Sequence, residues 1–276
     1  MSSGFPIVKM SGAGNDFVVI ERRDGEPFPD DLAAWTRQVC RRRQCVGADG
    51  VVVVERVGVD RVRVEFRNPD GTAAFCGNGT RCAARFARLR GITGPNLVLE
   101  TAAGEVRASV RDDLVGIALA PPRDDGRWEA EVAAERLEAR IVWAGTPHVV
   151  IVVDDVGSAP LDRWGPAIRK HGRFAPAGTN VNVVERRDRD VIHVRTWEKG
   201  VEGETLCCGS GAIAAAMAVR AGGGPARITV FPRSGSRLEV LLPGPPHAPT
   251  EAVLTGDARM VFEGFLHGEA TAFEVV

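Results

Sequence analysis

No apolar run in this 276-residue sequence approaches the roughly 20 residues that a membrane-spanning helix needs. Residues Met1 to Pro6 carry no basic flank that leads into an apolar region, so the sequence predicts no signal peptide. Net charge is lacking as well, because 35 Lys and Arg face 36 Asp and Glu, a formal net charge of −1. This balance favours neither nucleic acid nor an acidic membrane surface as a partner. We therefore expect a cytoplasmic protein without either partner.

The two-residue cysteine spacing that is typical of zinc sites and redox loops is absent. Of the six cysteines, Cys40 and Cys45 are separated by four residues, Cys76 and Cys82 by five, and Cys207 and Cys208 are adjacent. Disulfide scaffolds belong to small secreted chains that lack a core, and this chain is long enough to bury one. We therefore predict reduced thiols and no metal site. The sequence also lacks a phosphate loop and an obvious lysine context for pyridoxal phosphate, which predicts no cofactor.

Two turns of the form Cys-Gly-x-Gly are present, and each opens an expected helix. The first is Cys76-Gly77-Asn78-Gly79, and the second is Cys208-Gly209-Ser210-Gly211, which leads into the alanine-rich run 212–218. The turns lie about half the chain apart, so we expect two similar halves that each contribute one thiol. Run 212–218 is apolar on all sides, which is typical of a buried helix.

Short apolar runs bounded by turn residues predict many strands around these helices. In the first half the expected strands include 7–10, 17–20, 51–54 and 62–66, and in the second half 141–143, 149–153, 181–185, 191–196, 227–231, 237–242 and 258–263. Further helices are expected over 30–43 and 160–169. The pattern predicts an α/β protein in which strands wrap a helix in each half. The charged, proline-containing stretch 121–128 is the expected link, and we place one lobe at 1–126 plus 264–276 and the other at 127–263.

A pair of thiols at helix N-termini allows three kinds of chemistry. A helix N-terminus lowers the pKa of a thiol, so each cysteine could be a redox partner, a nucleophile or a base. A redox pair normally shares one Cys-x-x-Cys loop, and a nucleophile needs only one thiol. A pair of bases, of which one takes a proton from one face of a carbon and the other returns it on the opposite face, explains the duplication. Backbone N–H groups at both turns would stabilise the negative charge that develops on a carboxylate during α-proton abstraction.

The chain resembles the diaminopimelate epimerase family over nearly its whole length. The resemblance rests on these motifs in order: 9–17 (KMSGAGNDF), 47–50 (GADG), 68–71 (NPDG), 76–82 (CGNGTRC), 145–148 (GTPH), 178–182 (GTNVN), 197–200 (WEKG), Glu204-Thr205 and 208–211 (CGSG). It implies a cofactor-independent epimerase that interconverts LL- and meso-diaminopimelate in lysine and peptidoglycan precursor synthesis. It also implies two pseudo-symmetric lobes, each a barrel-like β-sheet around a central helix, a site in the cleft, and a homodimer.

The resemblance further implies roles for individual residues. Cys76 and Cys208 are the expected acid and base thiols, and His148 and Glu198 are expected beside the reacting centre, where they bind the amino group and tune the thiols. The expected substrate-binding set comprises the side chains of Asn15, Asn68, Asn180 and Lys199 and the backbone of Gly77, Asn78, Gly209 and Ser210. Cys82 and Cys207 are expected to be buried without a role in catalysis.

Two positions depart from the family pattern. The family usually has Glu-Arg-Gly where this chain has Glu198-Lys199-Gly200, and many members have Asn where this chain has Thr146. Lysine supplies the charge of arginine without its two-pronged geometry, so both positions bear on which substrate is held. A racemase of another amino acid on the same scaffold is the alternative. A non-catalytic amino-acid-binding protein and a thiol redox protein are the rivals from other classes.

Overall fold

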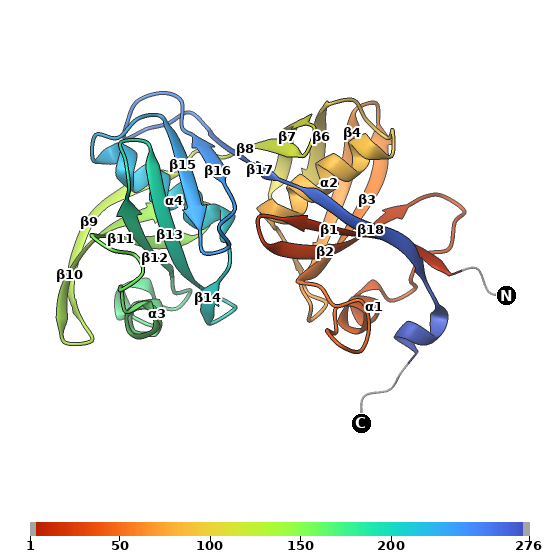
Figure 1. Cartoon of the computed structure of the whole chain (residues 1–276), viewed down its shortest axis with the longest axis horizontal. Coiled ribbons are helices and arrows are strands. Elements are labelled where there is room, and N and C mark those ends of the chain that lie inside the picture. The colour runs from red at the N-terminus through yellow and green to blue at the C-terminus, as the bar shows by residue number, and fades with distance from the viewer. Residues whose placement is uncertain (1–3, 273–276) are drawn as a thin grey trace. The chain divides into compact units, whose positions relative to one another are not determined.

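The computed structural model of the chain describes residues 4–272, which form two compact units. The first unit runs to Ile117 and resumes at Asp257, and the second is Ala118–Gly256. Within the described residues, no helix is long and apolar enough to cross a membrane. The fold is a mixed α/β fold with many strands and few helices, as the sequence predicts (Figure 1).

The first unit is built from short strands and two α-helices. Its elements are β1 (Phe5–Gly12), β2 (Asn15–Arg22), α1 (Leu32–Val39), β3 (Gly50–Gly58), β4 (Arg61–Arg67), β5 (Ala73–Ala74), α2 (Gly77–Leu89), β6 (Asn96–Thr101), β7 (Gly104–Arg111), β18 (Arg259–Leu266) and the 3-10 helix η2 (Gly268–Thr271). Strands β8 (Leu114–Leu119) and β17 (Ala252–Asp257) run through the two points at which the chain passes from one unit to the other.

The second unit has the same kind of composition. Its elements are β9 (Arg123–Val132), β10 (Glu135–Trp143), β11 (Pro147–Val153), α3 (Leu161–Arg169), the 3-10 helix η1 (Gly172–Phe174), β12 (Asn180–Arg186), β13 (Val191–Glu198), β14 (Gly203–Thr205), α4 (Gly209–Ala221), β15 (Arg227–Pro232) and β16 (Leu238–Leu241).

The two units repeat one topology. In the first, β1–β2 is antiparallel, β2–β3 parallel, β3–β4 antiparallel, β4–β6 parallel and β6–β7 antiparallel. In the second, β10–β11, β11–β12, β12–β13, β13–β15 and β15–β16 follow the same sequence of directions. Helices α1 and α3 occupy equivalent crossovers, and so do α2 and α4. The expected internal repeat is therefore present in the strand pairing itself.

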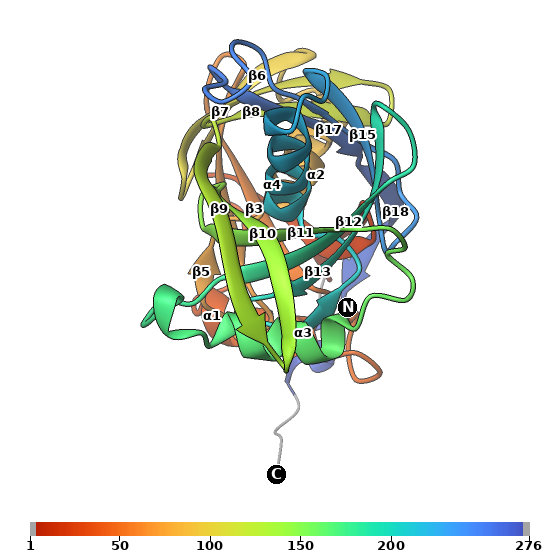
Figure 2. The same ribbon diagram turned by 90° about the vertical axis from the view of Figure 1, so that its left-hand side faces the viewer.

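Strands surround one 13-residue helix in each unit. Helix α2 packs against β1, β2, β3, β4, β6 and β7. Helix α4 packs against β9 to β13, β15 and β16, and Figure 2 shows it among these strands. Alanine and other small apolar residues let the strands approach α4 on every side, and Ala214, Ala215 and Met217 are fully buried. In α2, Cys82 is fully buried, as expected, whereas Leu89 is 50% exposed at the end of the helix.

The expected link and lobe boundaries differ from the observed ones. Stretch 121–128 was expected to be a link, but Arg123–Val132 forms β9, which pairs with β10 along its length. A partly buried ion pair between Asp124 and Arg140 joins β9 to β10. The first unit accordingly ends at Ile117, earlier than the expected 126, and resumes at Asp257, earlier than the expected 264, since β18 pairs with β1.

Candidate active site

Both motif cysteines are N-cap residues of the central helices. The Cys76 Sγ accepts the N–H of Gly79 at 3.4 Å, and the Cys208 Sγ accepts the N–H of Gly211 at 3.3 Å. Each cysteine has extended backbone angles, and helical bonding starts when its carbonyl accepts from Thr80 or Ala212. The N–H groups of the two intervening residues therefore lie outside the helical ladder, at the positive end of the helix dipole. Each unit thus presents one thiol beside backbone donors.

In the first unit an amide network lies at the start of α2. Asn78 Nδ2 donates to Asn15 Oδ1 at 2.6 Å, and Asn15 Nδ2 donates to Asp49 Oδ2 at 3.0 Å. Asp49 also accepts from the backbone of Asp16 at 3.2 Å and from Arg42 at 2.8 Å. The orientation of the Asn15 amide is therefore fixed, and the structure brings together two of the predicted substrate-binding side chains.

In the second unit His148 lies fully buried between two asparagines. Its Nε2 is 3.3 Å from Asn180 Nδ2, and its Nδ1 is 3.1 Å from Asn182 Nδ2. Asn180 Oδ1 accepts the backbone N–H of Lys199 at 2.7 Å. Burial, and to a smaller extent the positive charge of Lys199, lowers the pKa of His148 to about 3. His148 is therefore neutral at physiological pH.

Glu198, at the end of β13, lies beside the Cys208 thiol. Burial raises the pKa of the Glu198 carboxyl, and its hydrogen bond with Cys208 acts in the opposite direction. Burial also raises the pKa of Cys208 well above the usual value for a thiol, and the negative charge of Glu198 adds to this effect. Ser210 Oγ lies 3.4 Å from Cys208 Sγ. The local environment therefore favours the protonated thiol of Cys208.

Asn68 lies apart from these networks. Its Nδ2 donates to Thr72 Oγ1 at 3.1 Å, and its backbone N–H donates to the Thr72 carbonyl, so both groups stabilise the local turn. The remaining predicted residues belong to the clusters above: Gly77 and Asn78 open α2, Gly209 and Ser210 open α4, and Lys199 follows Glu198.

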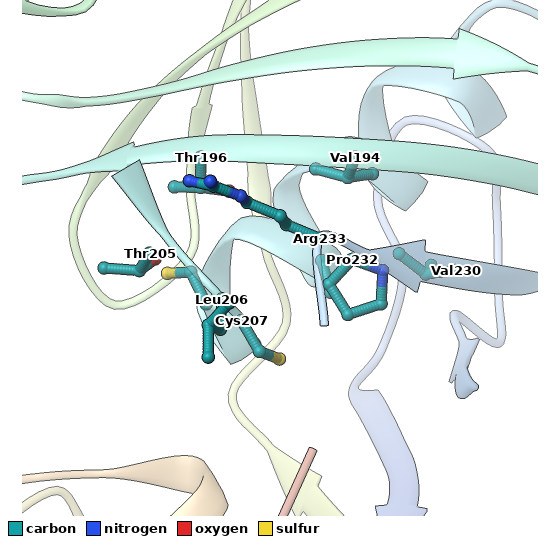
Figure 3. A pocket seen from close by; sticks show the side chains of 10 residues that line it. Val194, Thr196, Thr205, Leu206, Cys207, Val230, Pro232 and Arg233 are labelled. Atoms are coloured by element: carbon teal, nitrogen blue, oxygen red, sulfur yellow. The ribbon is translucent and has the colours of Figure 1, made fainter. Parts of the chain in front are cut away.

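Cys207 is 4% exposed, as expected for a small buried residue. It lines a small hollow together with Val194, Val230, Pro232 and Arg233 (Figure 3). Apolar and polar side chains both line the hollow, and Arg233 Nη1 lies 3.3 Å from Glu204 Oε2. Of the two adjacent cysteines, only Cys208 caps the helix.

Three polar residues escaped the sequence analysis as members of these clusters. Asp49 and Asn182 belong to motifs that were recognised, but no role was assigned to them, and Thr196 lies in an ordinary strand pattern. Thr196 Oγ1 donates to Asn182 Oδ1 at 2.9 Å in the interior of the unit. The alternation of β13 predicts that Thr196 faces inward, and a polar residue at an inward position would have indicated a member of the site.

Known proteins share both the sequence and the fold. A family model described as diaminopimelate epimerase matches residues 7–118 and 140–261. The diaminopimelate epimerase of Aquifex aeolicus is 39% identical over 96% of this chain and 99% of its own. An O-ureido-serine racemase of Streptomyces lavendulae is 37% identical over 96% of each chain. The crystal structure of a probable proline racemase from Agrobacterium radiobacter superposes with a TM-score of 0.70 at 17% identity, covering 98% of this chain and 96% of the other.

The repeated fold and its relatives define the class of the protein as an amino-acid epimerase or racemase, an isomerase. Within that class the match of the family model over most of the chain is decisive. The chain belongs to the diaminopimelate epimerase family.

Proposed function

We propose that the protein interconverts LL- and meso-diaminopimelate by proton transfer between two thiols and one α-carbon. The observation that carries the proposal is the duplicated cap, in which Cys76 and Cys208 each hold the third N–H of a central helix. Binding alone needs no thiol in either unit, and a redox pair needs no duplicated helix. Family membership supports diaminopimelate as the substrate.

In the proposed reaction one cysteine is a thiolate and the other is a thiol. The thiolate takes the α-proton, and the electron pair of the C–H bond passes into the α-carboxylate. The first-turn N–H groups of α2 and α4 are suited to the anion that forms. The second thiol then gives its proton to the opposite face of the carbon. The charge has moved from one sulfur to the other, so the reverse reaction starts from the product state.

Neutral His148 and buried Glu198 support different parts of this proposal. A neutral imidazole can donate to or accept from the substrate without repelling its ammonium group. Glu198 raises the pKa of Cys208 and so favours Cys208 as the thiol that delivers a proton. We also propose a cytoplasmic location, because the mechanism needs reduced thiols and the cytoplasm keeps thiols reduced.

A racemase of another amino acid is the second candidate, and two observations favour it. A relative of almost the same identity is an O-ureido-serine racemase, and Lys199 stands where the family usually has arginine. A lysine would meet a side-chain carboxylate with one charge and no two-pronged contact. The substrate, and not the proton transfer, separates the two candidates.

The proposal is tested in deuterated water under reducing conditions. Purified protein with LL-diaminopimelate should give the meso form with deuterium at one α-carbon. A panel of other amino acids, including O-ureido-serine, should show no exchange. Exchange on another amino acid with none on diaminopimelate would transfer the assignment to the second candidate. No exchange on any of them would remove the epimerase proposal.

We further propose that the chain acts as a homodimer through β18. This strand exposes Val261, Phe262 and Phe265 at 58%, 47% and 72% of their surfaces, and a second copy would cover them. Sedimentation equilibrium should give twice the mass of one chain, and Phe265→Glu should halve it. A wild-type protein that sediments as a single chain at micromolar concentration contradicts this proposal.

A further inference from the structure

The internal repeat gives each buried position near α4 a counterpart near α2. On the ladders, Val52 pairs with Phe66 in the first unit, and Asn182 pairs with Thr196 in the second. The third residue of each central helix, Gly79 in α2 and Gly211 in α4, lies next to the pair of its own unit. A Cβ on Gly79 would lie 3.3 Å from Val52 and 3.5 Å from Phe66, and one on Gly211 would lie 2.6 Å from Asn182 and 3.0 Å from Thr196.

The same register also relates Phe17 to His148. Phe17 pairs with Gly50, two residues before Val52, and His148 pairs with Asn180, two residues before Asn182. In the first unit this position is apolar, since Phe17 meets Phe66 edge to face at 5.9 Å. In the second unit the three equivalent positions are polar, and all three residues are buried.

The first unit therefore shows that the fold does not require polar residues at these positions. Buried polar groups cost stability unless their hydrogen bonds are made, and they add little where apolar side chains pack as well. In the second unit Asn182 and Thr196 lie against the first turn of α4, which Cys208 caps, because a Cβ on Gly211 would meet both of them. The position and chemistry of these polar residues indicate a role at the site instead of a role in folding.

Asn182 uses both of its amide hydrogens and its amide oxygen. Its Nδ2 donates to the Val149 carbonyl at 3.2 Å and faces His148 Nδ1 at 3.1 Å, and its Oδ1 accepts from Thr196 at 2.9 Å. The Val149 carbonyl can only accept, so it fixes which end of the amide faces the ring. Of the two amide contacts to the ring, the one at Nδ1 is shorter than the 3.3 Å between Nε2 and Asn180 Nδ2, so we assign Nδ1 as the acceptor of the second amide hydrogen and place the proton of the neutral ring on Nε2.

The other ring nitrogen faces a second donor. Asn180 is fixed by the Lys199 N–H, which its Oδ1 accepts, so its Nδ2 lies toward His148 Nε2. Two N–H donors then approach one another, with 3.3 Å between their nitrogens, and cannot satisfy one another. Such a pair is complementary to an acceptor atom, for which a carboxylate oxygen of the substrate has the right charge.

We propose that Asn182, oriented by Thr196, is a positioning residue that holds His148 as the neutral Nε2–H tautomer. His148 Nε2–H and Asn180 Nδ2–H are then both donors to one substrate oxygen. The inference rests on the proposed function in one respect, because it takes an amino acid as the ligand. The one charge that acts appreciably on His148 from the surrounding elements is that of Lys199, and it also favours the neutral ring.

Nitrogen NMR of ring-labelled histidine tests the tautomer directly, without activity. The chain has five histidines, and the spectrum of His148→Gln identifies the His148 signals. We expect a neutral Nε2–H pattern from pH 8 down to pH 5, and a shift of the Nε2 signal when diaminopimelate is added to the protein. A Nδ1–H pattern, or an imidazolium at pH 6, would overturn the proposal.

Asn182→Asp replaces the donor with an acceptor of the same shape. The proton should move to Nδ1, or the ring should become charged, and kcat should fall about 100-fold while KM changes little. Asn96→Asp makes the same change at an exposed position and should alter neither the spectrum nor kcat. An unchanged His148 pattern in Asn182→Asp would refute the positioning role. If that variant does not fold, the wild-type spectrum still decides the tautomer, and an Nε2–H pattern without turnover would count against the proposed function alone.

Discussion

Cys76→Ser and Cys208→Ser should each lower kcat for diaminopimelate about 10³-fold or more, because a hydroxyl is far too weak an acid to replace a thiol in proton transfer. Serine is a strong N-cap, so both variants should retain the bond from Gly79 or Gly211 that the sulfur now accepts. Cys76→Ala and Cys208→Ala should be equally inactive and less stable by about 1 kcal/mol, since alanine leaves the N–H uncapped. Coupled turnover assays and urea unfolding measure the two effects separately.

The other cysteines supply the controls for this experiment. Cys82→Ala and Cys207→Ala should retain turnover, because both thiols are buried and neither caps a helix. Burial raises the pKa of Cys82 to about 12, so it is no base at neutral pH. Turnover close to wild type in either Ser variant would contradict the two-thiol mechanism, as would inactivity of a correctly folded Cys207→Ala.

Much of the fold could be predicted because its determinants are local. The glycine turns, the alanine-rich run and the short β-branched segments each specify an element, and the repeated cysteine turn indicates the repeated unit. The lobe boundary could not be read in this way. The first half of β9 is polar on both faces, and only Trp128, Ala130 and Val132 in its second half face the core. The pairing of β9 with β10, which includes the Asp124–Arg140 contact, is set by residues that a local pattern does not connect.

The members of the candidate site could be predicted where a motif names them, but the protonation state of a side chain could not be predicted where a neighbouring residue determines it. The sequence places Cys208 at a helix start, but the raised pKa of its thiol depends on burial and on Glu198, which comes from the preceding strands. The environment of His148 depends on the parallel ladder that brings Asn180 and Asn182 beside it. Asn68 shows the opposite case, because a motif residue bonds within its own turn.

Glu198→Gln should lower the apparent pKa of Cys208 in the pH profile of kcat/KM, in both reaction directions. The first cause of the raised Cys208 pKa, burial, remains in the variant, whereas the second, the negative charge of Glu198, is removed. The thiolate is then less disfavoured, so the thiol loses its proton at a lower pH. When Cys208 is the acid this shifts the alkaline limb of kcat/KM, and when Cys208 is the base it shifts the acidic limb. Plots from pH 6 to 10 with LL- and meso-diaminopimelate measure the two directions.

The loop after β13 supplies a matched control for the charge. Glu202 lies four residues beyond Glu198, is exposed, and bonds to Arg169 and to the Gly200 N–H, so Glu202→Gln removes the same charge away from the thiol. The pH profiles of kcat/KM for Glu202→Gln should coincide with those of the wild type. In Glu198→Gln kcat should fall about 10- to 100-fold, since the carboxylate that bonds Cys208 is lost. Movement of the limb to higher pH in Glu198→Gln, or equal shifts in both variants, would mean that Glu198 does not act through the Cys208 thiol.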